Sequence, residues 1–427
     1  MLIACSLFIT CTPVLATSDP AAVNGLTLAQ AQQLALRNNA DFRIAQAQAD
    51  AALGQLRAVR EFPNPVIGYS VGKINTDGRS NATTTGSGFW ARSYDSIFSL
   101  SQLIELGKRG VRRTSAEAGA RSAEALRDDA RRLLLQATGQ LYFAALEAQQ
   151  EVRVLGASAA SVRKQAAIGS TRLHAGDIAA TDQAQIEIAA AQLDLSATSA
   201  GTAARIAVMA LEALLGYPSP RGETQLADTL EGVVSLPSGD NDTAPARPDL
   251  VAAQAALEKN EADLILQRRA ALPDLTLALQ YEHQPPDQPN TIGVGLSFPL
   301  PLWNRNQGNI LAAQAARNQA QAQLNKVRTQ VAATIAMARA AYEEAKTRSD
   351  TYQRNLEPKS ASIVRTIEYA YDKGGASLVG LLTAERNDND LRLASARAQA
   401  DAASAALALA AAFNRLDPAI ETLSRTP

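Results

Sequence analysis

The chain has 427 residues, and its 41 lysines and arginines nearly balance its 42 aspartates and glutamates, which leaves a formal net charge of −1. A nucleic-acid-binding protein needs a clustered basic face, so this balance argues against a nucleic-acid partner. Hydrophobic residues make up 46% of the chain but aromatic residues only 4%, so alanine and leucine supply most of the apolar surface. Such a composition is typical of long, closely packed helices rather than of ordinary globular domains.

The first 16 residues have the character of a signal peptide. Residues 1–14 are mostly apolar, and the Val-Leu-Ala that ends at Ala16 fits the small-x-small cleavage rule, although no basic residue precedes the run. Cleavage there removes Cys5 and Cys11, the only cysteines, and excludes disulfides and thiol chemistry from the mature chain. Alternatively, the Leu-Ile-Ala-Cys that ends at Cys5 resembles a lipobox, which would make Cys5 a lipid-modified N-terminus. The intact mass of the mature protein distinguishes the two.

The remainder of the chain divides into two structural repeats, each made of helix, two short strands and then long helices. The repeats are expected over residues 17–216 and 248–415. A segment rich in Pro, Gly, Asp and Ser, residues 217–247, joins them as a linker, and residues 416–427 form a C-terminal tail. This order predicts a mainly α fold with a small β part.

In the first repeat, residues 26–60 predict a helix with a break at the Asn-Asn pair, and a Pro-Asn-Pro sequence stops it. Strands follow at about 66–73 and 94–102, separated by a loop rich in Gly, Ser, Thr and Asn. Residues 108–168 contain no proline and few helix breakers, which predicts a helix roughly 90 Å long at 1.5 Å per residue.

The second repeat has the same elements in the same order. Its strands are expected at about 275–283 and 291–298, and its longest helix at 307–356. Each long helical stretch reverses at a glycine, Gly176 in the first repeat and Gly374 in the second, because glycine permits the left-handed conformation that ends a helix.

The predicted strands alternate strictly between apolar residues and small or polar ones. In the strand at 275–283, the apolar face holds Leu275, Leu277, Leu279 and Tyr281, and the polar face holds Thr276, Ala278, Gln280 and Glu282. This pattern matches a membrane β-barrel with lipid outside and water inside, although a soluble antiparallel sheet over a core is the alternative. Four strands cannot close a barrel, and lipid does not tolerate open sheet edges, so other copies of the chain must complete the sheet. No apolar stretch of about 20 residues follows residue 16, so no transmembrane helix is expected.

The long helices carry apolar residues at spacings of three and four, which predicts coiled-coil seams. The expected seam residues are Leu126, Ala130, Leu133, Ala137 and Leu141 in the first repeat, and Leu324, Val327, Val331, Ile335, Ala338 and Tyr342 in the second.

No pattern of catalytic, cofactor-binding or metal-ligating residues is present. The two histidines, His174 and His283, lie too far apart in the predicted topology to share a metal, and neither CxxC nor HxxxH spacing occurs. We therefore expect neither an enzyme nor a cofactor.

The chain resembles the TolC-like outer membrane efflux proteins over essentially its whole mature length, and most closely the outer membrane factors of heavy-metal resistance systems, the CzcC and CnrC type. The residues that carry the resemblance are the Pro63 and Pro65 strand entry, Leu100 to Arg109 with its second copy Leu296 to Arg305, the Arg247-Pro248-Asp249-Leu250 start of the second repeat, and the glycines Gly176 and Gly374.

The resemblance implies a homotrimer, in which three copies of four strands form a twelve-stranded barrel in outer membrane lipid and the helices form a hollow α-barrel in the periplasm. It also implies a duct that works with a periplasmic adaptor and an inner-membrane transporter of the RND type, exporting divalent cations such as cobalt, nickel, zinc or cadmium. The alternatives are a similar duct for drugs or other small molecules and a periplasmic coiled-coil scaffold without a pore.

The resemblance further implies that the two helix turns dock the adaptor and form the periplasmic gate. In relatives, an aspartate six residues after the first glycine bonds a tyrosine and an arginine of the neighbouring turn. Asp182 and Tyr371 match the first two positions, whereas Ala376 replaces the arginine, which predicts a weaker or differently built gate. Val379 begins a Val-Gly-Leu sequence like the adaptor motif of some relatives, but it follows the turn and is expected on the next helix.

Three acidic residues follow the second turn: Glu385, Asp388 and Asp390. If they face the lumen of the duct, they would favour the passage of cations. No ligand cluster supports a particular metal.

Overall fold

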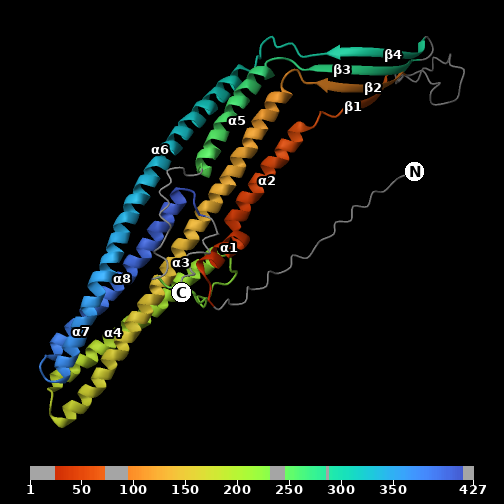
Figure 1. The fold of residues 1–427 in the computed structure, drawn as a ribbon. Coiled ribbons are helices and arrows are strands. Elements are labelled where there is room, and N and C mark those ends of the chain that lie inside the picture. The colour runs from red at the N-terminus through yellow and green to blue at the C-terminus, as the bar shows by residue number, and fades with distance from the viewer. Residues whose placement is uncertain (1–24, 73–94, 231–245, 285–287, 417–427) are drawn as a thin grey trace, which may run out of the picture. The chain divides into compact units, whose positions relative to one another are not determined.

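The computed structural model describes residues 25–72, 95–230, 246–284 and 288–416. In chain order the elements are α1 (Leu28–Asn38), α2 (Ala40–Arg60), β1 (Val66–Gly72), β2 (Asp95–Ile104), α3 (Arg109–Ala175), α4 (Ala180–Leu214), α5 (Pro248–Ala270), β3 (Leu275–Gln284), β4 (Gln288–Ser297), α6 (Gln307–Thr351), the π-helical segment η3 (Tyr352–Leu356), α7 (Glu357–Asp372) and α8 (Leu378–Ala412), as Figure 1 shows. The mainly helical fold with four strands is the one expected.

Some expectations fall outside the described residues. These are the signal peptide with Cys5 and Cys11, the loop between the first two strands, residues 231–245 of the linker, and the tail after Leu416.

The chain forms two compact units, and each unit combines segments of both sequence repeats. Unit 1 comprises Met1–Arg43, Ala130–Pro245 and Ala333–Pro427, and unit 2 comprises Ile44–Asp129 and Ala246–Ala332. Unit 2 therefore contains the strands, whereas unit 1 contains both glycine turns.

The break expected in the first helix is present and has a local cause. α1 ends at Asn38 and α2 begins at Ala40, with Asn39 between them. The Asn39 side-chain oxygen accepts a hydrogen bond from the Phe42 backbone N–H at 3.0 Å, which caps α2, and its amide nitrogen donates to the Leu214 carbonyl at 3.0 Å. One side chain thus starts α2 and ties it to the end of α4.

The four strands form one antiparallel sheet in the order β1-β2-β3-β4. The register places like residues side by side: Tyr69 pairs with Phe98, Phe98 with Tyr281, and Tyr281 with Ile292. The Tyr69 and Phe98 rings lie 4.7 Å apart between centroids. β1 and β4 are the edge strands, and neither has a partner strand on its outer side among the described residues.

The face of the sheet that carries this row is apolar and exposed. The side chains of Leu279, Ile292 and Val294 are 49%, 76% and 75% exposed. The opposite face carries small and polar residues, with Gly68, Ser99, Gln280 and Gly293 in one row across the sheet. The predicted alternation is therefore confirmed, but none of the described residues of the single chain covers the apolar face.

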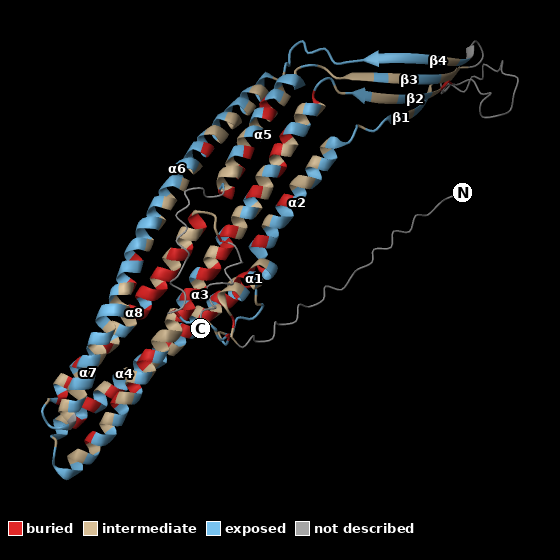
Figure 2. Cartoon of the chain, in the orientation of Figure 1, coloured by how far each residue is buried: buried red, intermediate tan, exposed pale blue. Residues whose placement is uncertain are grey.

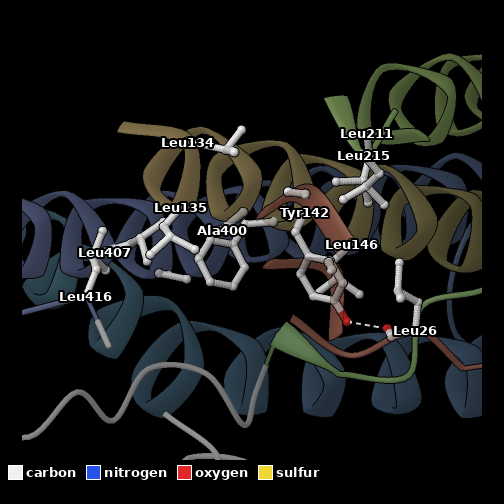
Figure 3. Close-up of a cluster of buried hydrophobic side chains, with 14 of the residues drawn as sticks. Leu26, Leu134, Leu135, Tyr142, Leu146, Leu211, Leu215, Ala400, Leu407 and Leu416 are labelled. Carbon is white, nitrogen blue, oxygen red and sulfur yellow. Dashed lines mark hydrogen bonds between the residues drawn. The ribbon is translucent and has the colours of Figure 1, made fainter. Parts of the chain in front are cut away.

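The largest core lies in unit 1, where buried residues of α1, α3, α4 and α8 meet (Figures 2 and 3). Its centre is Tyr142, which is fully buried and whose hydroxyl donates to the Leu26 carbonyl at 2.8 Å. The Tyr142 hydroxyl also lies 2.7 Å from an Asp228 carboxylate oxygen, which accepts from the Leu28 backbone N–H at 2.9 Å. A parallel bridge between Leu26 and Leu226 completes this attachment of the chain's first described residues to the segment after α4.

The predicted seams agree with the structure in one repeat and differ in the other. In α6, Leu324 is buried and the other seam residues from Val327 to Tyr342 are half-buried, as expected. In α3, by contrast, Leu126 and Leu133 are about half exposed, whereas Leu134 and Leu135 are buried. The other three expected residues, Ala130, Ala137 and Leu141, are half-buried, and Ala130 and Leu141 pack against the core of unit 1. The α3 prediction is therefore wrong only for the two leucines, because two adjacent helical stripes are both apolar there.

Candidate functional site

The two predicted glycine turns lie at the same end of the unit 1 helices, where α3 joins α4 and α7 joins α8 (Figure 1). At the first, Gly176 has φ +81°, its N–H donates to the Leu173 carbonyl at 3.1 Å, and the Asp177 N–H donates to the Arg172 carbonyl at 2.9 Å. These two bonds form a Schellman motif, which requires a left-handed residue at the position of Gly176.

The second turn repeats this geometry. Gly374 has φ +75°, its N–H donates to the Tyr371 carbonyl at 3.0 Å, and the Gly375 N–H donates to the Ala370 carbonyl at 2.7 Å. The Ser377 side chain then caps α8 by accepting from the Gly380 N–H at 3.1 Å. A Cβ added at either turn glycine meets no atom within 4 Å, so the backbone conformation, not crowding, calls for glycine.

A small apolar cluster packs the helices next to the turns. Val162 of α3, Ile186 and Ala190 of α4, and Leu378 of α8 are buried in it, and Tyr371 of α7 packs against it. The Arg172 guanidinium lies over the Tyr371 ring, 5.5 Å from its centroid, so the ends of α3 and α7 are in direct contact.

The two predicted gate residues lie close to these turns. Asp182 is half-buried in the first turn of α4, and Tyr371 is half-buried in the last turn of α7. Within the described residues of this single chain, neither side chain forms a hydrogen bond or an ion pair. Arg172 supplies a positive charge beside Tyr371, whereas the position at which the resemblance implies an arginine is Ala376. Val379 lies in α8, beyond the turn, and is exposed.

The three predicted acidic residues of α8 have different surroundings. Asp390 is exposed, Asp388 is buried at 7% exposure, and Glu385 is half-buried. Glu385 and Asp388 line a pocket of about 350 Å³ between α3, α7 and α8. Only Asp390 therefore lies on an open surface of the chain.

Next to this pocket, α3 presents a stripe of polar side chains to α8. Gln165 Nε2 donates to Glu385 Oε1 at 2.7 Å, and Ser161 Oγ donates to the same oxygen at 3.4 Å. One turn earlier on α3, the Ser158 hydroxyl donates to the Asn389 side chain. Sequence reasoning missed this stripe, although polar residues at spacings of three and four in an alanine-rich helix are a signal for it.

Burial raises the pKa of Glu385, and the negative charges of Glu368 and Asp388 raise it further. The hydrogen bonds from Gln165 and Ser161 act in the opposite direction but do not cancel the effect.

Metal coordination has little support in the described ranges. No group of three or more His, Cys, Asp or Glu side chains that could hold a metal ion occurs among those residues. His174 Nδ1 lies 2.7 Å from the Ser170 carbonyl within α3, and His283 Nδ1 lies 3.2 Å from the Asn290 side-chain oxygen in the sheet. Among the described helices, none is both long and apolar enough to cross a membrane.

The sequence matches the model of a protein family described as outer membrane efflux protein over residues 31–217 and 241–415. The chain is 26% identical over 375 residues to the cobalt-zinc-cadmium resistance protein CzcC of Cupriavidus metallidurans, covering 86% of this chain and 84% of that protein.

Solved structures with a similar fold include the CmeC outer membrane channel of Campylobacter jejuni, with a TM-score of 0.73 and 20% identity over 92% of this chain and 88% of that one. The MtrE outer membrane channel of Neisseria gonorrhoeae gives a TM-score of 0.72 and 20% identity over 90% of this chain and 88% of that one. CusC gives a TM-score of 0.73 and 18% identity over 90% and 91% of the two chains.

Proposed function

The chain belongs to the outer membrane efflux protein family, and we propose that it is the outer-membrane duct of a three-part pump that exports divalent heavy-metal cations. As a member of this family, the protein is an outer membrane protein. The coarser assignment, an efflux channel of the CzcC and CusC type, follows from the family and the fold. The partners, the passive mode of export and the individual cations are the proposed part.

The observation that carries the proposal is the four-stranded sheet with one exposed apolar face and two open edges. In lipid, an apolar outer face is favoured, whereas unpaired strand edges are not tolerated. We propose that β1 of one copy pairs with β4 of the next, so that a homotrimer closes a twelve-stranded barrel in outer membrane lipid. A periplasmic coiled-coil scaffold without a pore leaves this apolar face unexplained.

A pair of matched substitutions in the central strand β3 tests this part of the proposal. Leu279 and Gln280 are neighbours on opposite faces of the sheet. A basic residue in the bilayer midplane costs about 2–4 kcal/mol on the lipid face of a barrel strand. Leu279→Arg should therefore lower the yield of detergent-extracted, heat-modifiable trimers, whereas Gln280→Arg should leave it near that of the wild type. Equal yields from the two variants would contradict a lipid-facing role for the Leu279 face.

The helical part is proposed to act as a passive conduit. The turns at Gly176 and Gly374 are the proposed docking sites of a periplasmic adaptor, and an RND-type inner-membrane transporter supplies the energy. No catalysis and no cofactor are needed for conduction. Asp182 and Tyr371 are proposed to control opening at these turns, and Asp182→Ala and Tyr371→Phe should each change single-channel conductance. Unchanged conductance in both would remove them from the gate.

The choice of metal cations rests on the similarity to CzcC, which is a cobalt-zinc-cadmium resistance protein. Among the acids of α8, Asp390 is the exposed one, so its neutralisation should reduce any preference of the channel for cations. If the cation selectivity of the channel is unaltered in Asp390→Asn, Asp390 does not contribute to it.

The decisive experiment is complementation of a deletion strain that retains the matching pump and adaptor. Tolerance to cobalt, nickel, zinc, cadmium and copper is scored beside tolerance to one drug, with Leu279→Arg as the inactive control. Restored tolerance to some of the metals and not to the drug is the expected result and identifies the exported ions. Restored tolerance to the drug alone would support the duct but identify drugs, not metals, as its substrates. A fold shared with other efflux channels leaves that alternative open.

A further inference from the structure

Two carboxylates in the α3–α7–α8 pocket, those of the half-buried Glu385 and the buried Asp388, each have one buried oxygen that no hydrogen-bond donor of the described residues reaches. Glu385 Oε1 accepts from Gln165 and Ser161, but its Oε2 is buried and has no hydrogen-bond partner in the described parts of the chain. Asp388 Oδ2 accepts from Arg392 Nε at 2.7 Å, but its Oδ1 is buried and equally without a partner. A buried charged oxygen without a donor is costly, so this arrangement calls for an explanation.

The two unpartnered oxygens belong to neighbouring side chains. Glu385 and Asp388 are three residues apart on α8, which places them on the same face of the helix, and both line the pocket. A single proton on Glu385 Oε2, donated towards Asp388 Oδ1, would satisfy both atoms at once and replace two adjacent charges with one. Asp388 already accepts a hydrogen bond from Arg392, whereas Glu385 has no cationic partner among the described residues, so the proton is placed on Glu385.

The other charged groups around the pocket do not remove the need for this proton. α7 contributes Glu368, a third acid, and α3 contributes Arg153, which is exposed. Arg392 of α8 is bonded to Asp388 and is about half exposed. Neither arginine is within hydrogen-bonding or ion-pair distance of Glu385.

We propose that Glu385 and Asp388 share one proton in this pocket, and that this proton holds α8 against α3 on the Gly374 side of the helix. Glu385 lies two turns into α8, and its Oε1 accepts the hydrogen bonds from α3. Loss of the proton leaves two charges in the pocket, which favours entry of water and separation of α8 from α3. The inference rests on the contacts of this pocket and is independent of the proposed export function.

The sign of the pH dependence follows from the raised pKa of Glu385. A group whose pKa is higher in the folded state contributes its full stabilisation below the unfolded value of 4.5 and loses it as the pH rises through the folded value. The contribution of Glu385 to the stability of the wild-type protein should therefore decrease as the pH rises above 4.5. Glu385→Gln keeps the hydrogen bonds to α3 and places an amide N–H opposite Asp388. The stability of this variant should therefore not show the decrease that ionisation of Glu385 causes.

The test compares thermal unfolding of full-length wild-type protein and Glu385→Gln in detergent at about pH 5 and about pH 8. The two should unfold at similar temperatures at the lower pH, and the variant should unfold at a higher temperature at the higher pH. Asp390→Asn is the matched control, because it removes one exposed negative charge from the same helix and should show no such pH-dependent difference. A difference between wild type and Glu385→Gln that does not vary with pH would overturn the proposal.

Infrared spectroscopy provides a readout that does not depend on stability. Wild-type protein should show the carbonyl stretch of a protonated carboxylic acid above the pH at which ordinary glutamic acids ionise, and Glu385→Gln should lack this band. In Asp388→Asn the band should disappear at a lower pH, since the neighbouring charge is gone. A wild-type spectrum without the band would refute the shared proton. Stabilisation of the wild type, but not of Glu385→Gln, by added Zn²⁺ at about pH 8 would assign the pair to a cation instead.

Discussion

The carboxylate of Glu212 should be one of the most important single groups for the stability of unit 1. Glu212 is 3% exposed at the end of α4, and its Oε2 accepts from the backbone N–H groups of Arg221 at 2.6 Å and Gly222 at 2.8 Å. Its Oε1 accepts from the Thr224 N–H at 3.2 Å and the Thr224 hydroxyl at 2.7 Å. The segment that it holds leads directly to the Leu226 bridge, which fixes the start of α1.

We predict that Glu212→Gln destabilises this segment by about 3 kcal/mol. The amide has the same shape, but one acceptor oxygen becomes an NH₂ group, so two donors lose their acceptor. A hydrogen bond to a charged group contributes about 1.5–3 kcal/mol, and the lower value for two bonds gives about 3 kcal/mol. Since about 1.4 kcal/mol corresponds to a factor of ten, the open form of the segment should become on the order of 100-fold more populated.

Hydrogen exchange at the backbone amides of Arg221, Gly222 and Thr224 measures the population of the open form of this segment directly. Glu223→Gln is the matched control, because Glu223 is exposed in the same segment and loses the same charge. Protection factors within about threefold of the wild type in Glu212→Gln, or an equal loss in both variants, would refute the reasoning.

The contribution of Glu212 to stability depends on pH with the opposite sign to the contribution of Glu385. Burial opposes ionisation of Glu212, but the hydrogen bonds from Thr224, Gly222 and Arg221 outweigh it and lower its pKa. A lowered pKa contributes stability above the unfolded value of 4.5, and the contribution is lost as the pH falls through the folded value. Wild type and Glu212→Gln should therefore converge only below pH 4.5.

Three further predictions follow from the described contacts. Tyr142→Phe removes a buried hydroxyl, so the Leu26 carbonyl and the Asp228 carboxylate keep only the backbone N–H donors of Ala227 and Leu28, and the loss of the hydroxyl bonds should cost about 1 kcal/mol and lower the thermal unfolding midpoint. Gly176→Ala should cost about 1–2 kcal/mol because its φ is +81°, measured as faster hydrogen exchange at the α3–α4 turn, whereas Gly201→Ala within α4 should be neutral or stabilising. Asp274→Asn breaks the 2.8 Å ion pair to the buried Lys108, so it should lower the unfolding midpoint by more than the loss of an exposed pair does.

The local elements were predictable because each leaves a short-range signal. Strict alternation of apolar and polar residues predicted the strands and their faces, and adjacent asparagines predicted the break at Asn39. Glycine's ability to adopt the left-handed conformation that ends a helix predicted the turns at Gly176 and Gly374. The repeat boundaries, and the roles of the two turns and of Asp182 and Tyr371, stay predictions.

The burial of the long helices was less predictable for a physical reason. In α3, three consecutive leucines start at Leu133, and an alanine-rich helix offers nearly equal apolar stripes on either side of them. The contacts with α1 and α8 select Leu134 and Leu135 for the core, and they come from segments far away in sequence. The environment of Glu385 was hidden for the same reason, since its donor Gln165 lies in the other repeat.

The order of the strands also has a consequence for how the protein folds. The central pair of the sheet joins β2 to β3, with Ser96 opposite His283 and Ile104 opposite Leu275, so its contacts have very high sequence separation. Such contacts carry a large loop-closure cost and form slowly. After β1 and β2 have been synthesised, the inner edge of β2 has no partner until α3, α4 and α5 have followed, because β3 begins only at Leu275. During that interval β1 and β2 expose an apolar face and an unpaired edge, which are the features that make a folding intermediate prone to aggregate.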